Sequence, residues 1–373
     1  MPHLSTRMER LRPSPVREML NIAQQPGVIS FAGGLPAPET FADLDVPNPP
    51  ARLLQYGPSE GEPRLRVRIA EELTAIGLDC TAERVLILSG SQQGIDLIAK
   101  LVVDPGTAIA VDSPSYLAAL QVFRLFGARF VPLQTQTWSK TGPALAYVTP
   151  TFHNPTGACW TNAQRHMVAE ACDRHGVILL EDDPYRDLVY EDCDRRPVCA
   201  DVQHASWVYQ GSFSKTAMPG LRLGFLTASA DLFPYLVRLK QAADLHTNRL
   251  SQWIVLQLLE APDRRERLAA IAETYRRKRD SFAAALERHF GNLASWELPK
   301  GGMFFWVTLA DSIDVEALFS RALEHNVLFT PGSHFMANEE GGNAMRLNFS
   351  LADAVVAEQG LELLARLARQ LQE

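Results

Sequence analysis

Short runs of aliphatic residues recur along the chain up to Thr227, and each is followed by turn residues and then by a helical spacing of apolar positions. The runs are not interrupted by polar residues, which is typical of strands buried on both faces. Their alternation with helices predicts βαβ units and a mainly parallel sheet with helices on both sides. The predicted strands are Arg84–Leu88, Ala108–Val111, Ala144–Val148, Val177–Leu180, Trp207–Gln210 and Leu223–Thr227.

The pattern changes after Ala261. A charged helical stretch, Arg264–Arg279, is followed by two apolar runs, Met303–Leu309 and Met345–Phe349, with a helical pattern between them. This arrangement predicts a second, smaller α+β domain. A last helix is predicted to pack onto this domain through a face formed by Val356, Leu364, Leu367 and Leu371.

We expect three parts in the chain. Residues 1–49 are rich in proline and glycine and show little periodicity, so we expect them to pack on the small domain and the active site. Residues 50–262 would form the large domain, and residues 263–373 would form the small one. Neither an internal repeat nor a low-complexity tract interrupts this division.

The composition is that of a globular protein with a substantial core. The 373 residues are 46% hydrophobic and 21% charged, which suffices for one large domain or two of ordinary size. There are 36 lysine and arginine residues against 43 aspartate and glutamate residues, so the formal charge is −7. An acidic chain offers no basic surface to nucleic acid, and no apolar run reaches the length of a membrane span. We therefore expect a small-molecule partner.

The cysteines and the N-terminus bear on where the protein works. Five cysteines are scattered without a Cys-x-x-Cys pair, which indicates reduced thiols rather than a disulfide framework or a zinc site. Arg7, Arg10 and Arg12 are not followed by the apolar segment of a secretory signal. An organellar presequence is the alternative, but Glu9 and the prolines that follow would interrupt its amphipathic helix. We expect a cytoplasmic protein without a metal site.

The candidate chemistry begins with SFSKTAMPGLRLGF, residues 212–225. Lys215 follows a predicted strand and is flanked by the hydroxyls of Ser212 and Ser214 rather than by carboxylates. An amine that forms Schiff bases needs a lowered pKa, through desolvation or nearby positive charge, and Arg222 would supply that charge. Taken alone, the stretch also fits a solvated lysine in a surface loop.

Three further polar stretches follow predicted strands. The turn SGSQQG, Ser89–Gly94, opens an apolar helix, so its backbone N–H groups would suit a phosphate, although tight packing also explains it. In EDDPYRD, Glu181–Asp187, carboxylates end a buried strand and need a cationic partner. A metal is the alternative there, but no further ligand lies at suitable spacing. HNPTG presents the amide of Asn154, where an ordinary turn is the alternative, and we assign His153 no acid–base role.

A single cofactor would use all four groups. Pyridoxal 5′-phosphate carries a phosphate, a pyridine nitrogen, a 3′ oxygen and an aldehyde, which call for a cradle, an acid, an amide and an amine. The lysine stretch resembles the S-x-S-K-x-x-x-P-G-x-R signature of fold-type I pyridoxal-phosphate enzymes. The chain is most similar to the 2-aminoadipate, kynurenine and aromatic aminotransferases, and to the aminotransferase-like domains of winged-helix regulators. The similarity runs through FAGGLPAPETF, LQYGPSEGEPRLR, SGSQQGIDL, DSPSY, HNPTG, EDDPY, the lysine stretch, GGMFFWV and MRLNFS, in that order.

This resemblance implies the α/β fold of the fold-type I aminotransferases, with a mostly parallel seven-stranded sheet in the large domain and a smaller α+β domain. It also implies roles for residues. Lys215 would form the Schiff base and move the proton between Cα and C4′, and Asp182 would pair with the pyridine nitrogen. Asn154 and Tyr185 would hydrogen-bond to the 3′ oxygen, while Tyr116 would stack on the ring. The phosphate would be bound by Ser91, Gln92, Ser212, Ser214 and Arg222.

The resemblance also assigns residues to the substrate and to assembly. Arg346 and Asn154 would bind the amino acid, with the planar guanidinium of Arg346 holding the α-carboxylate, although a surface arginine at a strand edge is the alternative. Gly34, which has no Cβ, would let its loop approach that carboxylate. Tyr56 would reach the phosphate of the neighbouring subunit, so that each site is complete only in a homodimer. Arg17 would meet the side-chain carboxylate of acidic substrates, although arginines on solvated helix faces are commoner.

The function implied is a ping-pong aminotransferase that passes the α-amino group of an amino acid to a 2-oxo acid, with 2-oxoglutarate as the expected acceptor. A β-lyase, decarboxylase or cyclase is the nearest alternative, because the same anchors serve all these reactions. Residues 130–144 are shorter than the usual segment of the family, which makes close transfer of function less safe. A sensor domain is a further alternative, but the sequence starts almost directly at the aminotransferase body, so we expect no DNA-binding domain.

Overall fold

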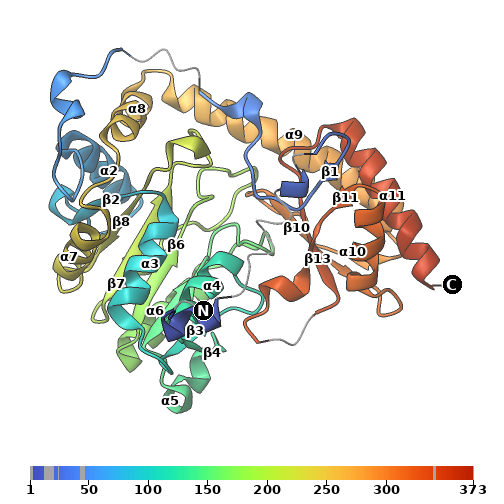
Figure 1. The fold of residues 1–373 in the computed structure, drawn as a ribbon, viewed down its shortest axis with the longest axis horizontal. Coiled ribbons are helices and arrows are strands. Elements are labelled where there is room, and N and C mark those ends of the chain that lie inside the picture. Colours follow the sequence, from blue (N-terminus) through green and yellow to red (C-terminus); the bar gives the residue numbers. More distant parts are fainter. Residues whose placement is uncertain (1–2, 12–20, 24, 43–46, 339–341, 373) are drawn as a thin grey trace.

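The computed structural model describes residues 3–11, 21–23, 25–42, 47–338 and 342–372. Its larger part is built on a seven-stranded sheet in the order β2-β8-β7-β6-β5-β3-β4 (Figure 1). Only β8 runs antiparallel to its neighbours in this sheet, and the other pairs are parallel. The strands are β2 (Val85–Leu88), β3 (Ala108–Val111), β4 (Arg129–Pro132), β5 (Leu145–Val148), β6 (Ile178–Asp182), β7 (Trp207–Ser212) and β8 (Gly224–Ala228).

Each of the six predicted runs forms a strand of this sheet, with ends that differ by at most two residues from the prediction. The strand β4 was not predicted. It lies at the edge of the sheet and buries only Val131, so it lacks the continuous apolar run of the central strands. An edge position also tolerates Pro132, because the side of the strand that faces solvent needs no ladder hydrogen bond.

Helices cover both faces of the sheet, which gives three layers. One face packs against α3 (Ser91–Val102), α4 (Leu117–Phe126) and α7 (Phe233–Asp244). The other face packs against α2 (Pro63–Ala75), α6 (Asn162–His175) and α8 (Arg249–Glu260). The short α5 (Trp138–Thr141) lies between β4 and β5. Apolar side chains alternate between the two layers along each strand, so both faces of the sheet are buried.

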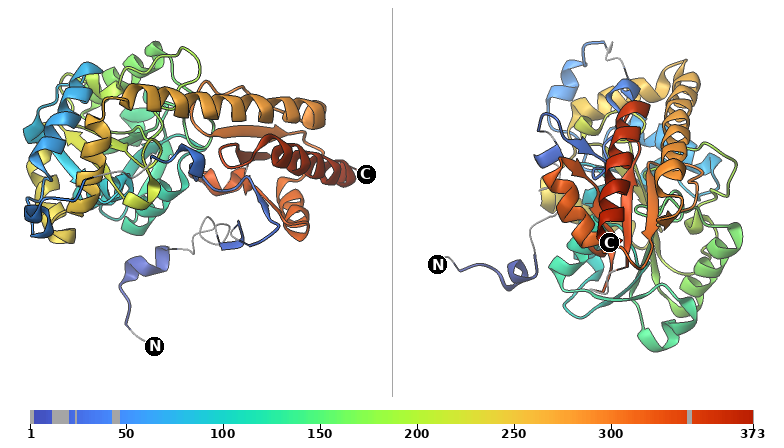
Figure 2. Two further views of the ribbon diagram at one scale, coloured as in Figure 1. Left: turned by 90° about the horizontal axis from the view of Figure 1, so that it is seen from above. Right: turned by 90° about the vertical axis from the view of Figure 1, so that its right-hand side faces the viewer.

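The smaller part follows a long helix, α9 (Arg264–Phe290), which runs from one part to the other (Figure 2). Its antiparallel sheet has the order β12-β13-β10-β9 and packs with two more helices. The predicted α+β organisation is therefore confirmed. The elements are β9 (Ala294–Ser295), β10 (Phe304–Leu309), α10 (Val315–Glu324), β12 (Thr330–Pro331), β13 (Ala344–Asn348) and α11 (Ala354–Gln372).

The C-terminal helix packs as the sequence predicts. Leu364 and Leu367 are buried in the core of the smaller part, and Val356 and Leu371 pack against it. The N-terminal segment is tied to the same part, because β1 (Ile29–Ser30) pairs in parallel with β11 (Val327–Leu328). The exact borders of the three parts stay a prediction. Within the described residues no helix is long and apolar enough to cross a membrane.

Candidate active site

The carboxyl ends of β5, β6 and β7 open into a pocket with about 740 Å³ of empty space. Ligands of open α/β sheets bind at this edge. Tyr56 is the one predicted cofactor residue that does not line the pocket of its own chain. The residues that do line it are Ser91, Gln92, Tyr116, Asn154, Asp182, Tyr185, Ser212, Ser214, Lys215 and Arg222, with Tyr147, Thr149 and Pro184.

Lys215 is half-buried in the turn that follows β7. Its Nζ donates a hydrogen bond of 2.9 Å to the carbonyl oxygen of Gly34 and lies 5.7 Å from the centre of the Tyr185 ring. Burial, together with the positive charges of Arg346 and Arg222, lowers the pKa of Lys215 to about 8. Arg222 lowers the pKa of this amine, as the sequence predicts, and Arg346 lowers it more than Arg222 does. A larger share of this amine is neutral near physiological pH than for an ordinary lysine.

Two glycines let the proposed phosphate-binding groups come together. Gly90, the N-cap residue of α3, has a φ of +83°, and a Cβ built there would lie 2.5 Å from the Arg222 guanidinium. A Cβ on Gly224 would lie 2.7 Å from the backbone nitrogen of Ser91. Larger residues at either position would push the turn before α3 away from Arg222. In the neighbouring turn, Ser212 Oγ accepts a hydrogen bond of 3.1 Å from the Ser214 backbone.

Asp182 ends β6 and points into the pocket with one oxygen unsatisfied. Its Oδ2 accepts a hydrogen bond of 2.9 Å from Tyr147, whereas the buried Oδ1 has no partner. Burial raises the pKa of Asp182 to about 6, while the nearby Gln210 amide and the Tyr147 hydroxyl act in the opposite direction. A buried carboxylate oxygen without a donor is costly, so this position suits a ligand with an N–H group.

Arg346 connects the smaller part to the pocket. Its Nη1 donates a hydrogen bond of 2.8 Å to Asn154 Oδ1, and its Nη2 donates to the carbonyl of Ala32. The guanidinium lies between the rings of Phe304 and Phe335, at 4.4 and 4.7 Å from their centres. The residue is buried, so the alternative of a surface arginine is wrong. Burial lowers the pKa of Arg346 to about 10, and its Nε–H has no hydrogen-bond acceptor.

Asn154 lies between Arg346 and Tyr185. Its Oδ1 accepts from Arg346, and its Nδ2 donates to the Tyr185 hydroxyl at 3.5 Å. The amide is thereby oriented with its nitrogen toward the pocket. Its neighbour His153 is buried, with its Nδ1 2.8 Å from the Thr156 hydroxyl, and burial lowers the pKa of His153 to about 4. His153 is therefore neutral and structural.

Among the described residues, three of the predicted ones do not line this pocket: Arg346, Gly34 and Tyr56. Gly34 lies at its border, where its carbonyl meets Lys215 and a Cβ would lie 3.1 Å from the Phe304 ring. Tyr56 is 76% exposed and touches His246 edge-on, away from the pocket of its own chain. Arg17 lies outside the described residues.

Tyr147 and Thr149 were missed in the sequence. Tyr147 is a fully buried hydroxyl-bearing residue within β5, and Thr149 follows directly after that strand. The Thr149 hydroxyl also donates a hydrogen bond of 3.5 Å to the Tyr147 hydroxyl. A hydroxyl in an otherwise aliphatic strand, close to the carboxyl end where ligands bind, was the available signal.

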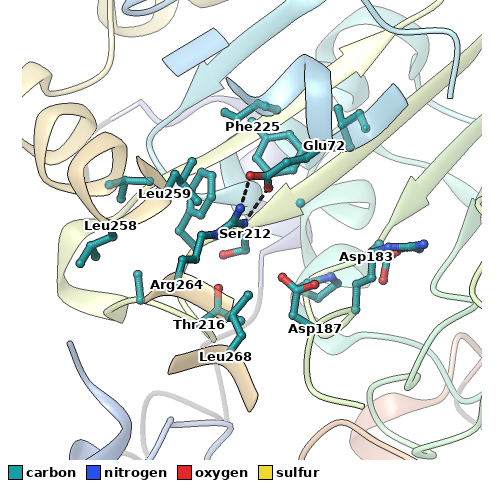
Figure 3. A pocket seen from close by; sticks show the side chains of 18 of the residues that line it. Glu72, Asp183, Asp187, Ser212, Thr216, Phe225, Leu258, Leu259, Arg264 and Leu268 are labelled. Atoms are coloured by element: carbon teal, nitrogen blue, oxygen red, sulfur yellow. Dashed lines mark hydrogen bonds and ion pairs between the residues drawn. The ribbon is translucent and has the colours of Figure 1, made fainter. Parts of the chain in front are cut away.

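A second, smaller cavity lies behind the Lys215 turn and shares Pro184 and Ser212 with the first pocket. Arg264 crosses it to form two hydrogen bonds with Glu72 (Figure 3). None of its lining residues is a lysine, cysteine or histidine. The reactive groups therefore gather in the first pocket. In the part of the chain that the structure describes, no cluster of three potential metal ligands occurs.

Comparison with known proteins bears out the resemblance seen in the sequence. A family model for "Aminotransferase class I and II" matches residues 50–362. The chain is 37% identical to the 2-aminoadipate transaminase of Thermus thermophilus, covering 96% of this chain and 94% of that protein. It is 33% identical to aromatic-amino-acid aminotransferase 1 of Thermococcus litoralis, covering 95% and 91%.

A solved structure agrees with these sequence relatives. The chain superimposes on the α-aminoadipate aminotransferase of Thermus thermophilus, complexed with N-(5′-phosphopyridoxyl)-L-leucine, with a TM-score of 0.88. The two share 34% identity, and the match covers 99% of this chain and 97% of the other. The fold predicted for the large and small parts is therefore confirmed. The chain belongs to the class I and II aminotransferase family.

Proposed function

We propose that the protein is a pyridoxal-phosphate-dependent aminotransferase that passes the α-amino group of an amino acid to a 2-oxo acid. We further propose 2-oxoglutarate as the acceptor and a ping-pong order of the two half-reactions. The observation that carries the proposal is the meeting, in one pocket, of the Lys215 amine with the unsatisfied Asp182 oxygen. The family match and the relatives named for aminotransferases support the same activity.

The residues of the pocket fit this cofactor. The free Oδ1 of Asp182 would accept a hydrogen bond from the protonated pyridine nitrogen. Asn154 and Tyr185, whose polar atoms lie 3.5 Å apart, would both donate to the 3′ oxygen. Tyr116 would lie on the face of the ring. The phosphate would be held by Ser91, Gln92, Ser212, Ser214 and Arg222, near the positive end of α3.

Lys215 would attach the cofactor as a Schiff base through Nζ and afterwards act as the base at the substrate Cα. When bound, the cofactor supplies a conjugated ring that stabilises negative charge at that carbon. Lys215 suits both tasks because its lowered pKa leaves more of the amine neutral. The hydrogen bond from Nζ to the carbonyl of Gly34 holds the amine on the side of the pocket next to the N-terminal segment.

Arg346 would hold the α-carboxylate of the donor and of the acceptor. The Phe304 and Phe335 rings fix the plane of its guanidinium, and Nε–H remains available as a donor. Asn154 would assist by accepting from Nη1. The bare backbone of Gly34 would leave room for the substrate next to this group. Fixed donors of this kind orient the Cα–H bond and reduce the entropy lost on reaching the transition state.

The remaining parts of the proposal concern specificity, assembly and location. Arg17 would recognise an acidic side chain in the donor. The exposed Tyr56 would reach the phosphate in the other subunit of a homodimer, which would explain why it lies away from its own pocket. We also propose a division at residues 49 and 262 and a cytoplasmic location.

A half-reaction screen tests the proposed function. Purified protein is loaded with pyridoxal 5′-phosphate and mixed with acidic, aromatic, aliphatic and basic amino acids, while the cofactor absorbance is recorded. We expect absorbance to be lost with the donor and regained when 2-oxoglutarate is added. Borohydride followed by peptide mapping should label Lys215. Release of CO₂ or ammonia without dependence on an oxo acid would favour a decarboxylase or lyase, and a colourless protein that binds DNA would favour a sensor.

A further inference from the structure

A polar cluster, in which Lys240 is buried and Asp244 is partly exposed, lies directly behind the segment Ser89–Gln93 that leads into α3. Lys240, on α7, is fully buried, and its Nζ lies 2.6 and 2.8 Å from the two carboxylate oxygens of Asp244. The same Nζ donates to Thr247 Oγ1 at 2.8 Å. All three hydrogens of the ammonium group can thus be satisfied inside the protein. An ammonium group that is buried this deeply is tolerated only with such partners.

Asp244 also accepts hydrogen bonds from the side chains at both ends of the segment Ser89–Gln93. Its Oδ2 accepts from Ser89 Oγ at 3.0 Å and from Gln93 Nε2 at 2.8 Å. The Ser89 backbone N–H in turn donates to Gln93 Oε1 at 2.9 Å. Thr247 Oγ1 donates to the carbonyl of Ile87, the strand residue just before the turn. Hydrogen bonds to Asp244 and Thr247 therefore fix both ends of the segment 87–93.

Ser91 and Gln92, the first two residues of α3, lie between these fixed positions and depend on this support. Ser91 and Gln92 line the pocket, and within the described residues neither side chain has a hydrogen-bond partner. Their positions therefore follow the backbone to which they are attached, and that backbone is fixed by Ser89 and Gln93. A small shift of the turn would move two of the proposed phosphate ligands together.

Stability alone does not explain the pair. Lys240 is fully buried, whereas 30% of the Asp244 side chain is exposed, and a buried charge is often no more stabilising than an apolar residue of the same size, so an apolar residue at position 240 would serve packing equally well. The contacts of Asp244 reach Ser89 and Gln93, on either side of the two pocket residues. We infer that Lys240 and Asp244 are positioning residues that hold the turn Ser89–Gln93 in the shape that binds the cofactor phosphate. The inference rests on the proposed use of pyridoxal 5′-phosphate.

The experiment compares two ligands that differ only in the phosphate. Full-length protein freed of cofactor is titrated with pyridoxal 5′-phosphate and with pyridoxal, and binding is followed by absorbance and protein fluorescence. The variants are Asp244→Asn and Lys240→Met. The matched control is Lys100→Met, which breaks the ion pair with Asp96 at 2.5 Å on the outer face of α3. Thermal unfolding without ligand shows that each variant is folded.

We expect both variants to weaken pyridoxal 5′-phosphate binding by about 10-fold or more, the effect of losing a hydrogen bond to a charged group. Their affinity for pyridoxal, and both affinities of Lys100→Met, should stay within about twofold of the wild type. Equal losses for the two ligands, or no loss, would overturn the inference while leaving the proposed function intact. A wild-type protein that binds neither ligand would instead overturn the proposed function. If Lys240→Met does not fold, Ser89→Ala removes a single hydroxyl and permits the same comparison.

Discussion

Arg346 Nη1 donates a hydrogen bond of 2.8 Å to Asn154 Oδ1 and so links the small sheet to the loop after β5. The two residues are 192 positions apart in the chain. Because this bond uses the amide oxygen, the amide nitrogen is directed to Tyr185 and the pocket. One contact therefore orients both a substrate-binding group and a cofactor-binding group in the proposed site.

Replacing Arg346 should impair the binding of carboxylates rather than of the cofactor. For Arg346→Gln we expect kcat/KM to fall about 10- to 100-fold for the amino donor and for the oxo acid, because both carry an α-carboxylate. Cofactor absorbance should be retained. The slow reaction of an amine donor that lacks a carboxylate should change little. The control is Arg277→Gln, at a side chain that is 70% exposed. Loss of the cofactor spectrum would show instead that Arg346 is mainly structural.

Removing the amine of Lys215 should separate binding from catalysis. For Lys215→Ala we expect turnover to fall by at least about 10⁴-fold, since nucleophile and base are lost together. Pyridoxal 5′-phosphate should still bind through the phosphate contacts and Asp182, but borohydride should fix none of it to the protein. Mass spectrometry after reduction measures this directly. Label on another lysine would contradict the assignment of Lys215.

The capture of pyridoxal 5′-phosphate by cofactor-free protein should depend on the ionisation of Lys215. Only the neutral amine attacks the aldehyde, so the rate should rise with pH through a midpoint near the pKa of about 8 and then level off. In Arg346→Gln a positive charge beside the amine is removed, so the ammonium form gains stability and the midpoint should move to higher pH. Stopped-flow absorbance gives both midpoints. A midpoint that stays unchanged would mean that Arg346 does not act on Lys215.

Arg17 offers a test of the proposed substrate class. If its guanidinium meets an acidic side chain, Arg17→Ala should lower kcat/KM by about 10-fold for glutamate and 2-aminoadipate and leave aromatic donors unaffected. The control is Arg7→Ala, at an arginine that contacts the Phe126 ring at 5.9 Å. Equal losses for all donors would contradict a role in specificity.

The central strands could be predicted because burial on both faces requires continuous apolar runs, as in Leu145–Val148. The edge strand Arg129–Pro132 could not be predicted, because a strand at the edge of the sheet is not buried on both faces and needs no continuous apolar run. The pocket residues that follow strands could be placed together because parallel strands end at one edge. By contrast, the burial of Arg346 and the bond from Lys215 to the carbonyl of Gly34 depend on contacts between distant segments, which no local pattern specifies.

Tyr147 was missed for a related reason, since its position within a buried strand favours a packing role, and its partner Asp182 lies on the neighbouring strand. In the structure, Tyr147 also has a chemical role through its hydrogen bond to Asp182. After Gln210, the Tyr147 hydroxyl is the second group that favours the ionised form of Asp182 and opposes the effect of burial on that pKa. In Tyr147→Phe the pKa of Asp182 should therefore rise above about 6, and the carboxylate should become protonated at a higher pH.

The pH dependence of kcat/KM measures this change. A protonated Asp182 is a weaker partner for the pyridine nitrogen, so we expect Tyr147→Phe to lose about 10-fold at pH 6 and much less at pH 9. Tyr209→Phe is a matched control, because Tyr209 is equally buried and donates to Asp183 Oδ2 at the same 2.9 Å, on the side of β6 away from the pocket. That variant should lose stability without moving the acid limb. If both variants moved the limb equally, the Tyr147 hydroxyl would be acting through the stability of β6 and not on the charge of Asp182.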